Sequence, residues 1–128
     1  MKEIYTLNLQ LYHKSKEIRK MSSNTYIRNE AKNGFKGWTK EGWDFLLHNE
    51  QYKTVAISSL AKILEQNDEV EFIYNNLHYE IFASADTGYV VNIYSSNEKD
   101  EYEQYLEKNN IDGGLCTGTA KDAIEFMM

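Results

Sequence analysis

Three side chains in this sequence have the chemistry needed to hold a small phosphorylated nucleotide. Phe82 carries a ring on which a purine base could stack, and such a stack contributes about 1–3 kcal/mol per base. The amide of Asn92 can hydrogen-bond to a base or ribose edge. Arg28, one of two arginines in the chain, can bind a phosphate through two hydrogen bonds at once. Together these residue types predict a nucleotide-binding site.

A segment near the C-terminus that is rich in glycine and threonine could hold a second phosphate. It spans residues 112–119 and contains Asp112, Gly113, Gly114, Thr117, Gly118 and Thr119. A loop of this kind before a helix presents free backbone N–H groups and the positive end of the helix dipole to an anion. It is not a P-loop, because the Gly-Lys-Ser/Thr ending is absent. The alternative interpretation is a tight turn followed by a helix cap.

Catalytic and metal-binding patterns are weak in this chain. Cys116 is the single cysteine, and a nucleophilic role would need a nearby base, whereas the three histidines lie on separate predicted elements. The histidines also lack the spacing of metal ligands, so we expect no metal and no other cofactor. Glu71 and Glu80 could share acid–base chemistry, although such carboxylates are more commonly solvated. We expect a binding protein rather than an enzyme, with a small nucleotide hydrolase as the alternative.

The first elements that must position these residues are a strand and a helix. Residues 5–11 alternate apolar and polar side chains, which predicts a strand with one buried face. Residues 15–32 follow a helical period, and Gly34 comes after them as a stop signal. The N-terminal part of the fold is therefore expected to be a strand followed by a helix.

Two further helices are predicted before the middle of the chain. Thr39 is expected to cap a short helix whose buried side includes Trp43 and Leu46. Residues 52–58 could form a strand or a helix. Ser58 or the serine after it would then cap the next helix.

The segment 69–96 predicts three antiparallel strands joined by two tight turns. Asn75 and Asn76 both tolerate a positive φ, as a two-residue hairpin requires. Residues 86–88, Asp-Thr-Gly, fit a three-residue loop that ends on glycine. These turns set the registers and place Phe82 directly across from Asn92. If a two-residue turn forms instead, Phe82 pairs with Val91.

The same registers divide the strand side chains between two faces of the sheet. The expected core face holds Val70, Phe72, Tyr79, Ile81, Ala83, Val91 and Ile93. The opposite face holds Glu71, Ile73, His78, Glu80, Phe82, Asn92 and Tyr94. The predicted ligand residues of the sheet thus lie on the face that the main core does not use.

Two short helices are expected to close the chain. Residues 97–108 predict an acidic helix, and the Asn- and Gly-rich residues 109–114 predict its end. Thr119 and Asp122 have the spacing of a capping box at the start of the last helix. The predicted fold is α+β: an antiparallel β-meander with helices packed on one face, an N-terminal strand and helix, and two short C-terminal helices.

Composition limits the classes of partner. The 128 residues predict a single domain, 1–128, and carry a net charge of −6, which disfavours duplex DNA and anionic membranes. A single cysteine and the lack of a long apolar run favour a cytoplasmic protein. Residues 1–40 carry a net charge of +6 and the remainder −12, which suits self-association or a local anion site.

The combination resembles the first family of Thoeris anti-defence proteins, which phages use as sponges for cyclic ADP-ribose isomers made by bacterial TIR proteins. The likeness covers most of the chain: its size, the N-terminal strand and helix, the hairpin from Phe82 to Asn92 and the Gly-rich segment 112–119. It implies that Phe82 and Asn92 contact the base, that Arg28 contacts the phosphates, and that residues 112–119 contact the ribose and phosphate edge. The family uses an arginine near the end of the penultimate helix, where this chain has Lys108.

The resemblance also implies a mechanism without turnover. A sponge lowers the free concentration of a signal by tight stoichiometric binding in the cytoplasm of the infected bacterium. It further implies a homo-oligomer and a second site for cyclic oligonucleotides, which the sequence does not place. The alternative is an acidic phage inhibitor that binds a host defence protein directly, as DNA mimics do, supported by the −12 charge of residues 41–128.

Overall fold

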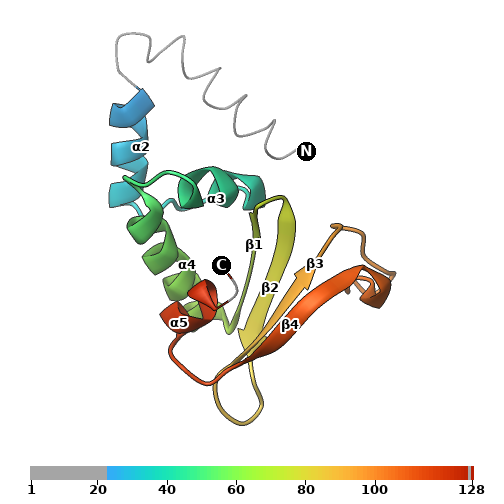
Figure 1. Cartoon of the computed structure of the whole chain (residues 1–128). Coiled ribbons are helices and arrows are strands. Elements are labelled where there is room, and N and C mark those ends of the chain that lie inside the picture. The colour runs from blue at the N-terminus through green and yellow to red at the C-terminus, as the bar shows by residue number, and fades with distance from the viewer. Residues whose placement is uncertain (1–22, 127) are drawn as a thin grey trace.

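A four-stranded antiparallel sheet carries the fold, and helices cover one of its faces (Figure 1). The computed structural model describes residues 23–126 and residue 128. Its elements are α2 (Ser23–Lys32), α3 (Lys40–Leu47), α4 (Lys53–Asn67), β1 (Glu69–Tyr74), β2 (Leu77–Ala83), β3 (Tyr89–Tyr94), the 3-10 helix η1 (Glu107–Asn109), β4 (Asn110–Cys116) and α5 (Ala120–Glu125). The strand order β1-β2-β3-β4 confirms an α+β meander, while the strand predicted at 5–11 lies outside the described residues.

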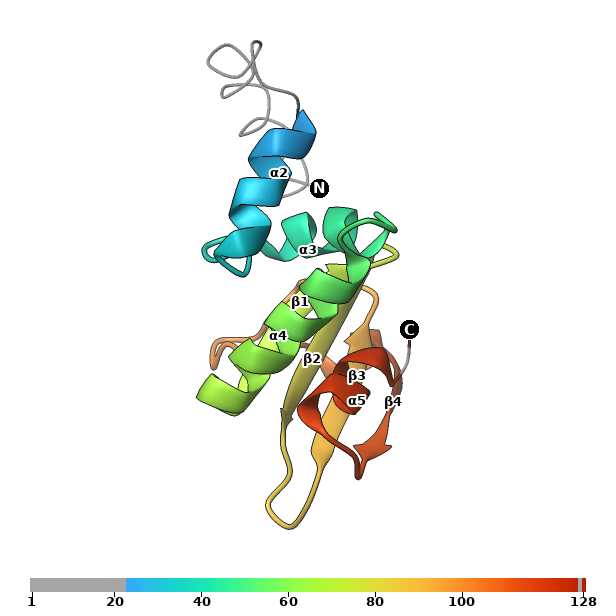
Figure 2. The same cartoon turned by 90° about the vertical axis from the view of Figure 1, so that its left-hand side faces the viewer.

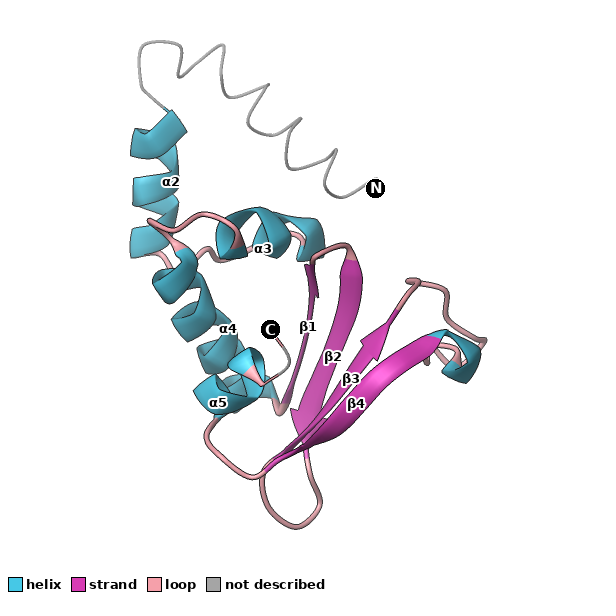
Figure 3. Cartoon of the chain, in the orientation of Figure 1, coloured by secondary structure: helices cyan, strands magenta, loops and turns pink. Residues whose placement is uncertain are grey.

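The helical layer and the sheet enclose one core (Figure 3). In Figure 2, α4 crosses in front of the sheet, and α3, α4 and α5 all contact strands. The largest fully buried side chains come from both layers: Phe35, Phe72, Leu46, Leu47, Leu60, Leu64, Ile81, Ile124 and Val91. None of the helices in the described part of the chain is long and apolar enough to cross a membrane.

The predicted cap of α3 is confirmed. The Thr39 side chain accepts a hydrogen bond from the backbone N–H of Gly42 at 3.1 Å, which satisfies one of the free donors at the helix start. Trp43, Leu46 and Leu47 are buried, as their spacing predicts.

The start predicted for α4 is wrong. The helix begins at Lys53 and passes through Ser58 and Ser59 without interruption. Ala56, Ile57, Leu60, Ala61 and Leu64 form its buried side. This apolar stripe has a helical period across both serines, so packing on the core outweighs the weak helix propensity of serine.

The first hairpin agrees with its prediction. Asn75 and Asn76 have positive φ values of 54° and 63°, and Tyr74 pairs with Leu77 across the two-residue turn. The expected core-face side chains are buried except for Ala83, which is half-buried.

The predicted register of the second hairpin is wrong by two residues. Ala83 pairs with Tyr89, so Phe82 lies opposite Val90 and Asn92 lies opposite Glu80. The loop is longer than expected because Ser84 N–H bonds to the carbonyl of Gly88 and the strands pair only beyond it. A Cβ at Gly88 would lie 2.2 Å from the Cys116 carbonyl oxygen, so the loop packs closely on the end of β4. A shift of two keeps every side chain on its predicted face.

The acidic helix predicted at 97–108 is also wrong, as is the loop predicted after it. Residues 95–106 form an irregular segment with an isolated bridge between Lys99 and Tyr105, and residues 110–116 form β4. The open edge of β3 pairs with β4, and this long-range pairing outweighs the local turn signals of the glycines. One short C-terminal α-helix, α5, therefore replaces the predicted two, and its capping box is confirmed.

Candidate functional site

The face of the sheet that the α-helices leave uncovered, here called the open face, holds the candidate site. The register continues each row of side chains across β2, β3 and β4. One row consists of Phe82, Val90 and Leu115, and the next consists of Glu80, Asn92 and Gly113. An apolar row and a polar row are thus neighbours on one surface.

The apolar row, here called the platform, is accessible. Phe82 and Val90 are half-buried, and Leu115 is 52% exposed. Because the second hairpin is shifted, Asn92 lies diagonally from Phe82 rather than opposite it, a Cα separation of about 7–8 Å in antiparallel sheets. A ring placed on the platform could still reach the Asn92 amide.

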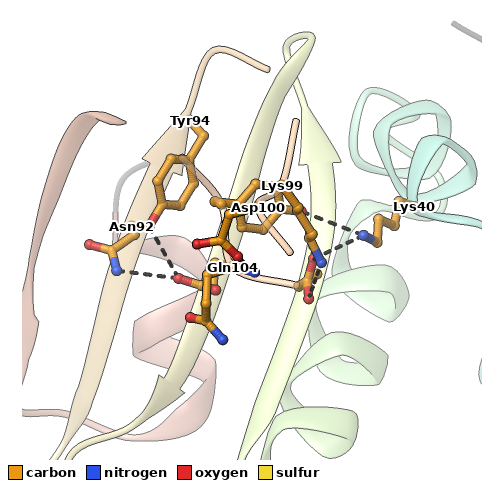
Figure 4. A network of polar contacts seen from close by, with 9 residues as sticks. Lys40, Asn92, Tyr94, Lys99, Asp100 and Gln104 are labelled. Carbon is orange, nitrogen blue, oxygen red and sulfur yellow. Dashed lines mark hydrogen bonds and ion pairs between the residues drawn. The ribbon is translucent and has the colours of Figure 1, made fainter. Parts of the chain in front are cut away.

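The polar row is uncovered at its β4 end. The Asn92 amide donates to Glu80 Oε1 at 3.4 Å, and the Tyr94 hydroxyl donates to the same oxygen at 3.3 Å (Figure 4). Burial and the neighbouring Glu80 raise the pKa of Tyr94, so its hydroxyl remains a donor at neutral pH. Gly113 presents no side chain here, and a Cβ at that position would lie 2.8 Å from Asn92 Oδ1. The Asn92 amide therefore packs closely on Gly113 and occupies the space that a side chain there would need.

Glu71 lies at the end of the open face over which the segment 95–106 packs. Its carboxylate accepts hydrogen bonds from Lys40 of α3 at 2.9 Å, from Lys99 at 3.3 Å and from the Tyr105 hydroxyl at 2.5 Å (Figure 4). Tyr105 stacks on Tyr94 with 4.6 Å between ring centroids. These contacts hold the segment 95–106 and the start of α3 against the sheet.

The electrostatic balance at Glu71 favours the ionised carboxylate. Burial raises the pKa of Glu71, but the hydrogen bonds from Tyr105 and Lys40 and the charges of Lys40 and Lys99 outweigh it. The pKa therefore lies below its ordinary value of 4.5. Beside this network, burial and the charge of Lys40 lower the pKa of His78, whose buried Nδ1 has no hydrogen-bond partner among the described residues. His78 is neutral at neutral pH.

The predicted ligand residues are only partly brought together. Phe82, Asn92 and Gly113 share the open face, but Arg28 is exposed on α2, which lies at the end of the molecule away from β4 (Figures 1 and 2). Lys108, which stands where the family has an arginine, is exposed on η1. One chain does not place Arg28 beside the platform.

The loop predicted at 112–119 is wrong over residues 112–116, whereas the alternative of a helix cap at Thr119 is confirmed. Asp112, Gly113 and Gly114 are in β4 and pair with β3. Thr117 and Gly118 connect β4 to α5, whose first free N–H groups are satisfied internally, since the Asp122 carboxylate accepts from Thr119 N–H at 2.9 Å. A carboxylate already occupies that helix start, and it would repel a phosphate. Among the described residues no group of three or more His, Cys, Asp or Glu side chains could hold a metal.

Sequence reasoning missed the contribution of β4 to the site. Val90 and Leu115 complete the platform, and Tyr105 and Lys99 complete the Glu71 network. The alternation of Ile111, Gly113 and Leu115 was a signal for a strand, but glycine is a common residue in loops and concealed it.

The described part of the chain is thus an α+β protein with a helix-covered meander and a partly exposed platform on the open face. A scan against protein-family models found no match, and searches of the curated proteins and of the solved structures also found none. The resemblance to Thoeris anti-defence proteins stays a prediction from the sequence.

Proposed function

We propose that this protein binds and sequesters a cyclic ADP-ribose isomer, a TIR-derived immune signal, without breaking a bond in it. In this proposal it is a phage counter-defence protein that acts as a homo-oligomeric sponge. The observation that carries the proposal is the open face itself, where the Phe82 platform lies beside the Asn92 amide, which packs on Gly113. A partly exposed apolar row next to hydrogen-bonding groups suits a purine ring with polar edges.

Each group on the open face has a role in the proposal. The adenine ring lies on Phe82 with Val90 and Leu115 beside it, and Asn92 hydrogen-bonds to the base edge. The Glu80 carboxylate is an acceptor suited to ribose hydroxyls. Stacking and hydrogen bonding of this kind hold the ligand without breaking a covalent bond in it, as sequestration requires.

The phosphates require a cation, and no lysine or arginine of the described residues belongs to the platform rows. In the proposal Arg28 of a second copy supplies it, since α2 of the same chain lies away from β4. The +6 charge of residues 1–40 and the −12 charge of residues 41–128 favour such pairing between copies. Ile111 and Leu115, 54% and 52% exposed on the edge strand β4, provide an apolar contact surface for it.

Shared sites predict complementation between two defective variants. Phe82→Ala and Arg28→Ala should each bind ligand poorly, while a refolded mixture should recover a fraction of high-affinity sites, because mixed assemblies contain one intact pair. The measurement is a calorimetric titration of each variant and of the mixture. A mixture that binds no better than its components would contradict shared sites.

The function is tested by titrating the purified wild-type protein with glycocyclic ADP-ribose isomers, followed by heat denaturation and chromatography of the released ligand. Tight binding with intact release supports a sponge. Altered product would make the protein an enzyme and direct attention to Glu80, Glu71 and His78. The absence of binding would overturn the proposal. Light scattering with and without ligand gives the number of subunits.

Adding a methyl group at position 113 should weaken binding several-fold. In Gly113→Ala the new Cβ would lie 2.8 Å from Asn92 Oδ1, so the amide must rotate away and lose its contact with Glu80. Affinity is measured by calorimetry, and the thermal unfolding midpoint shows whether the sheet is intact. Wild-type affinity in a folded variant would remove Asn92 and Gly113 from the site.

A second candidate function is direct inhibition of a host protein through an acidic surface. Residues 98–107 expose five carboxylates, those of Glu98, Asp100, Glu101, Glu103 and Glu107, and Tyr102 among them is 74% exposed. Such an interface would lose affinity steeply as ionic strength rises. Stacking of a base on Phe82 depends far less on salt, so the salt dependence of binding separates the two functions.

A further inference from the structure

A groove that none of the platform residues line runs along the exposed side of α4, beside the turn that follows α2. Its volume is about 710 Å³, within the range of about 300–1,000 Å³ that is typical of small-molecule sites. One wall is α4, where Ser58 and Lys62 are one helical turn apart. The other wall is the end of α2 and the turn after it, with Lys32 and Lys36. The two walls lie close together, since a Cβ added at Gly34 would lie 3.6 Å from the Ser59 hydroxyl oxygen.

The charge of the groove is unusual for this chain. Three lysines line it, Lys32, Lys36 and Lys62, and no aspartate or glutamate is among its described lining residues. The protein as a whole has 20 acidic and 14 basic side chains. A basic hollow in an acidic protein concentrates field lines and attracts small anions.

The neutral lining suits the same kind of ligand. Thr54 and Val55 belong to the first turn of the 15-residue helix α4, where the helix dipole favours negative charge. The hydroxyl of Ser58 and the amide of Gln66 lie on the same wall and can donate hydrogen bonds to phosphate oxygens. Val55 and Ile63 add an aliphatic strip that an organic group can cover.

We propose that this groove, here called the basic groove, binds a small molecule that carries two or more phosphate charges, with Lys62 on one wall and Lys32 and Lys36 on the other. Lysines on opposite walls favour a ligand whose charges are spread over neighbouring phosphates, as in a pyrophosphate group, over a single compact monoanion. The site uses none of the open-face residues, so it does not depend on the proposed function.

The test uses sodium pyrophosphate as the probe, titrated calorimetrically into the full-length protein at low ionic strength. Lys62→Ala and, on the other wall, Lys36→Ala should each raise the dissociation constant about tenfold, since each removes a charge-assisted hydrogen bond. Lys121→Ala, which removes an exposed lysine of α5 outside the groove, is the matched control and should bind as the wild type does. Thermal unfolding midpoints verify that the variants are folded.

Several results would overturn the proposal. No saturable binding of pyrophosphate, or wild-type affinity in both groove variants, would show that the groove is not a phosphate site. Loss of pyrophosphate binding in Phe82→Ala would place the anion on the open face instead. Displacement of pyrophosphate by a single-stranded oligonucleotide at much lower concentration would identify a nucleic-acid backbone as the occupant. Retained pyrophosphate binding in Phe82→Ala supports the groove even if the cyclic ADP-ribose proposal fails.

Discussion

Replacing Phe82 with alanine should weaken binding of the cyclic ADP-ribose ligand by about ten- to a hundredfold, because base stacking on an aromatic ring contributes about 1–3 kcal/mol. The loss should be specific to the ligand. Phe82 is half-buried on the open face rather than part of the core, so the alanine variant should fold. The measurement is calorimetric titration of wild type and variant, together with their thermal unfolding.

The matched control for Phe82→Ala is Tyr102→Ala. Tyr102 is an exposed aromatic residue outside the platform, and its removal should leave nucleotide affinity unchanged. If Phe82→Ala binds with wild-type affinity while folded, the platform is not the base site. If Tyr102→Ala instead abolishes binding to a protein partner, the acidic inhibitor becomes the better explanation.

Replacing Glu71 with glutamine should lower the free energy of unfolding by about 1.5–3 kcal/mol. The variant keeps the shape of the side chain but removes the charge that Lys40, Lys99 and the Tyr105 hydroxyl contact. Hydrogen bonds to charged groups contribute about 1.5–3 kcal/mol, and the loss should fall within this range because Glu71 is only partly exposed. Chemical denaturation gives the free energy of unfolding, and hydrogen exchange should show faster opening of the segment 95–106.

Glu69→Gln is the control for Glu71→Gln, since Glu69 lies on the same strand and is exposed. It should change the free energy of unfolding by less than about 0.5 kcal/mol. Equal effects of the two exchanges would show that the network around Glu71 does not hold the segment in place.

The stabilisation by Glu71 should also depend on pH, with a defined sign. The pKa of Glu71 is lowered in the folded protein, so its contribution is complete above the ordinary value of 4.5 and is lost as the pH falls through the lowered folded value. His78, whose pKa is also lowered, favours unfolding below its ordinary value of 6.5. The useful quantity is therefore the difference in unfolding free energy between wild type and Glu71→Gln, which should shrink between neutral pH and pH about 3. A constant difference would exclude the charge of Glu71 as the cause.

Several elements could be predicted from neighbouring residues alone, because their signals are local. Thr39 and Thr119 cap helices through contacts three residues away, and Asn75 and Asn76 accept the positive φ that a two-residue hairpin requires. The alternation of apolar and polar residues along the strands predicted the face on which each side chain lies. Side chains alternate with a period of two, so a two-residue shift in register leaves each of them on the same face.

The composition of the candidate site depended on contacts between residues far apart in the chain. The loop around Gly88 packs on Cys116, which shifts Asn92 from Phe82 to Glu80. Tyr105 stacks on Tyr94 and bonds to Glu71, and these contacts replace the helix predicted for its segment.

Local patterns in this chain were therefore sufficient for the α+β class, the caps of α3 and α5, the first hairpin and the two faces of the sheet, since each depends on residues within a few positions of one another. Tertiary packing decided that the glycines of residues 112–116 form an edge strand and that Leu115 completes the platform. It also brought Lys62 of α4 together with Lys32 and Lys36 in one groove. The pairing of β4 with β3 and the packing of α4 on the core stabilise the fold only when segments far apart in the sequence meet. A short stretch of sequence therefore does not predict either contact.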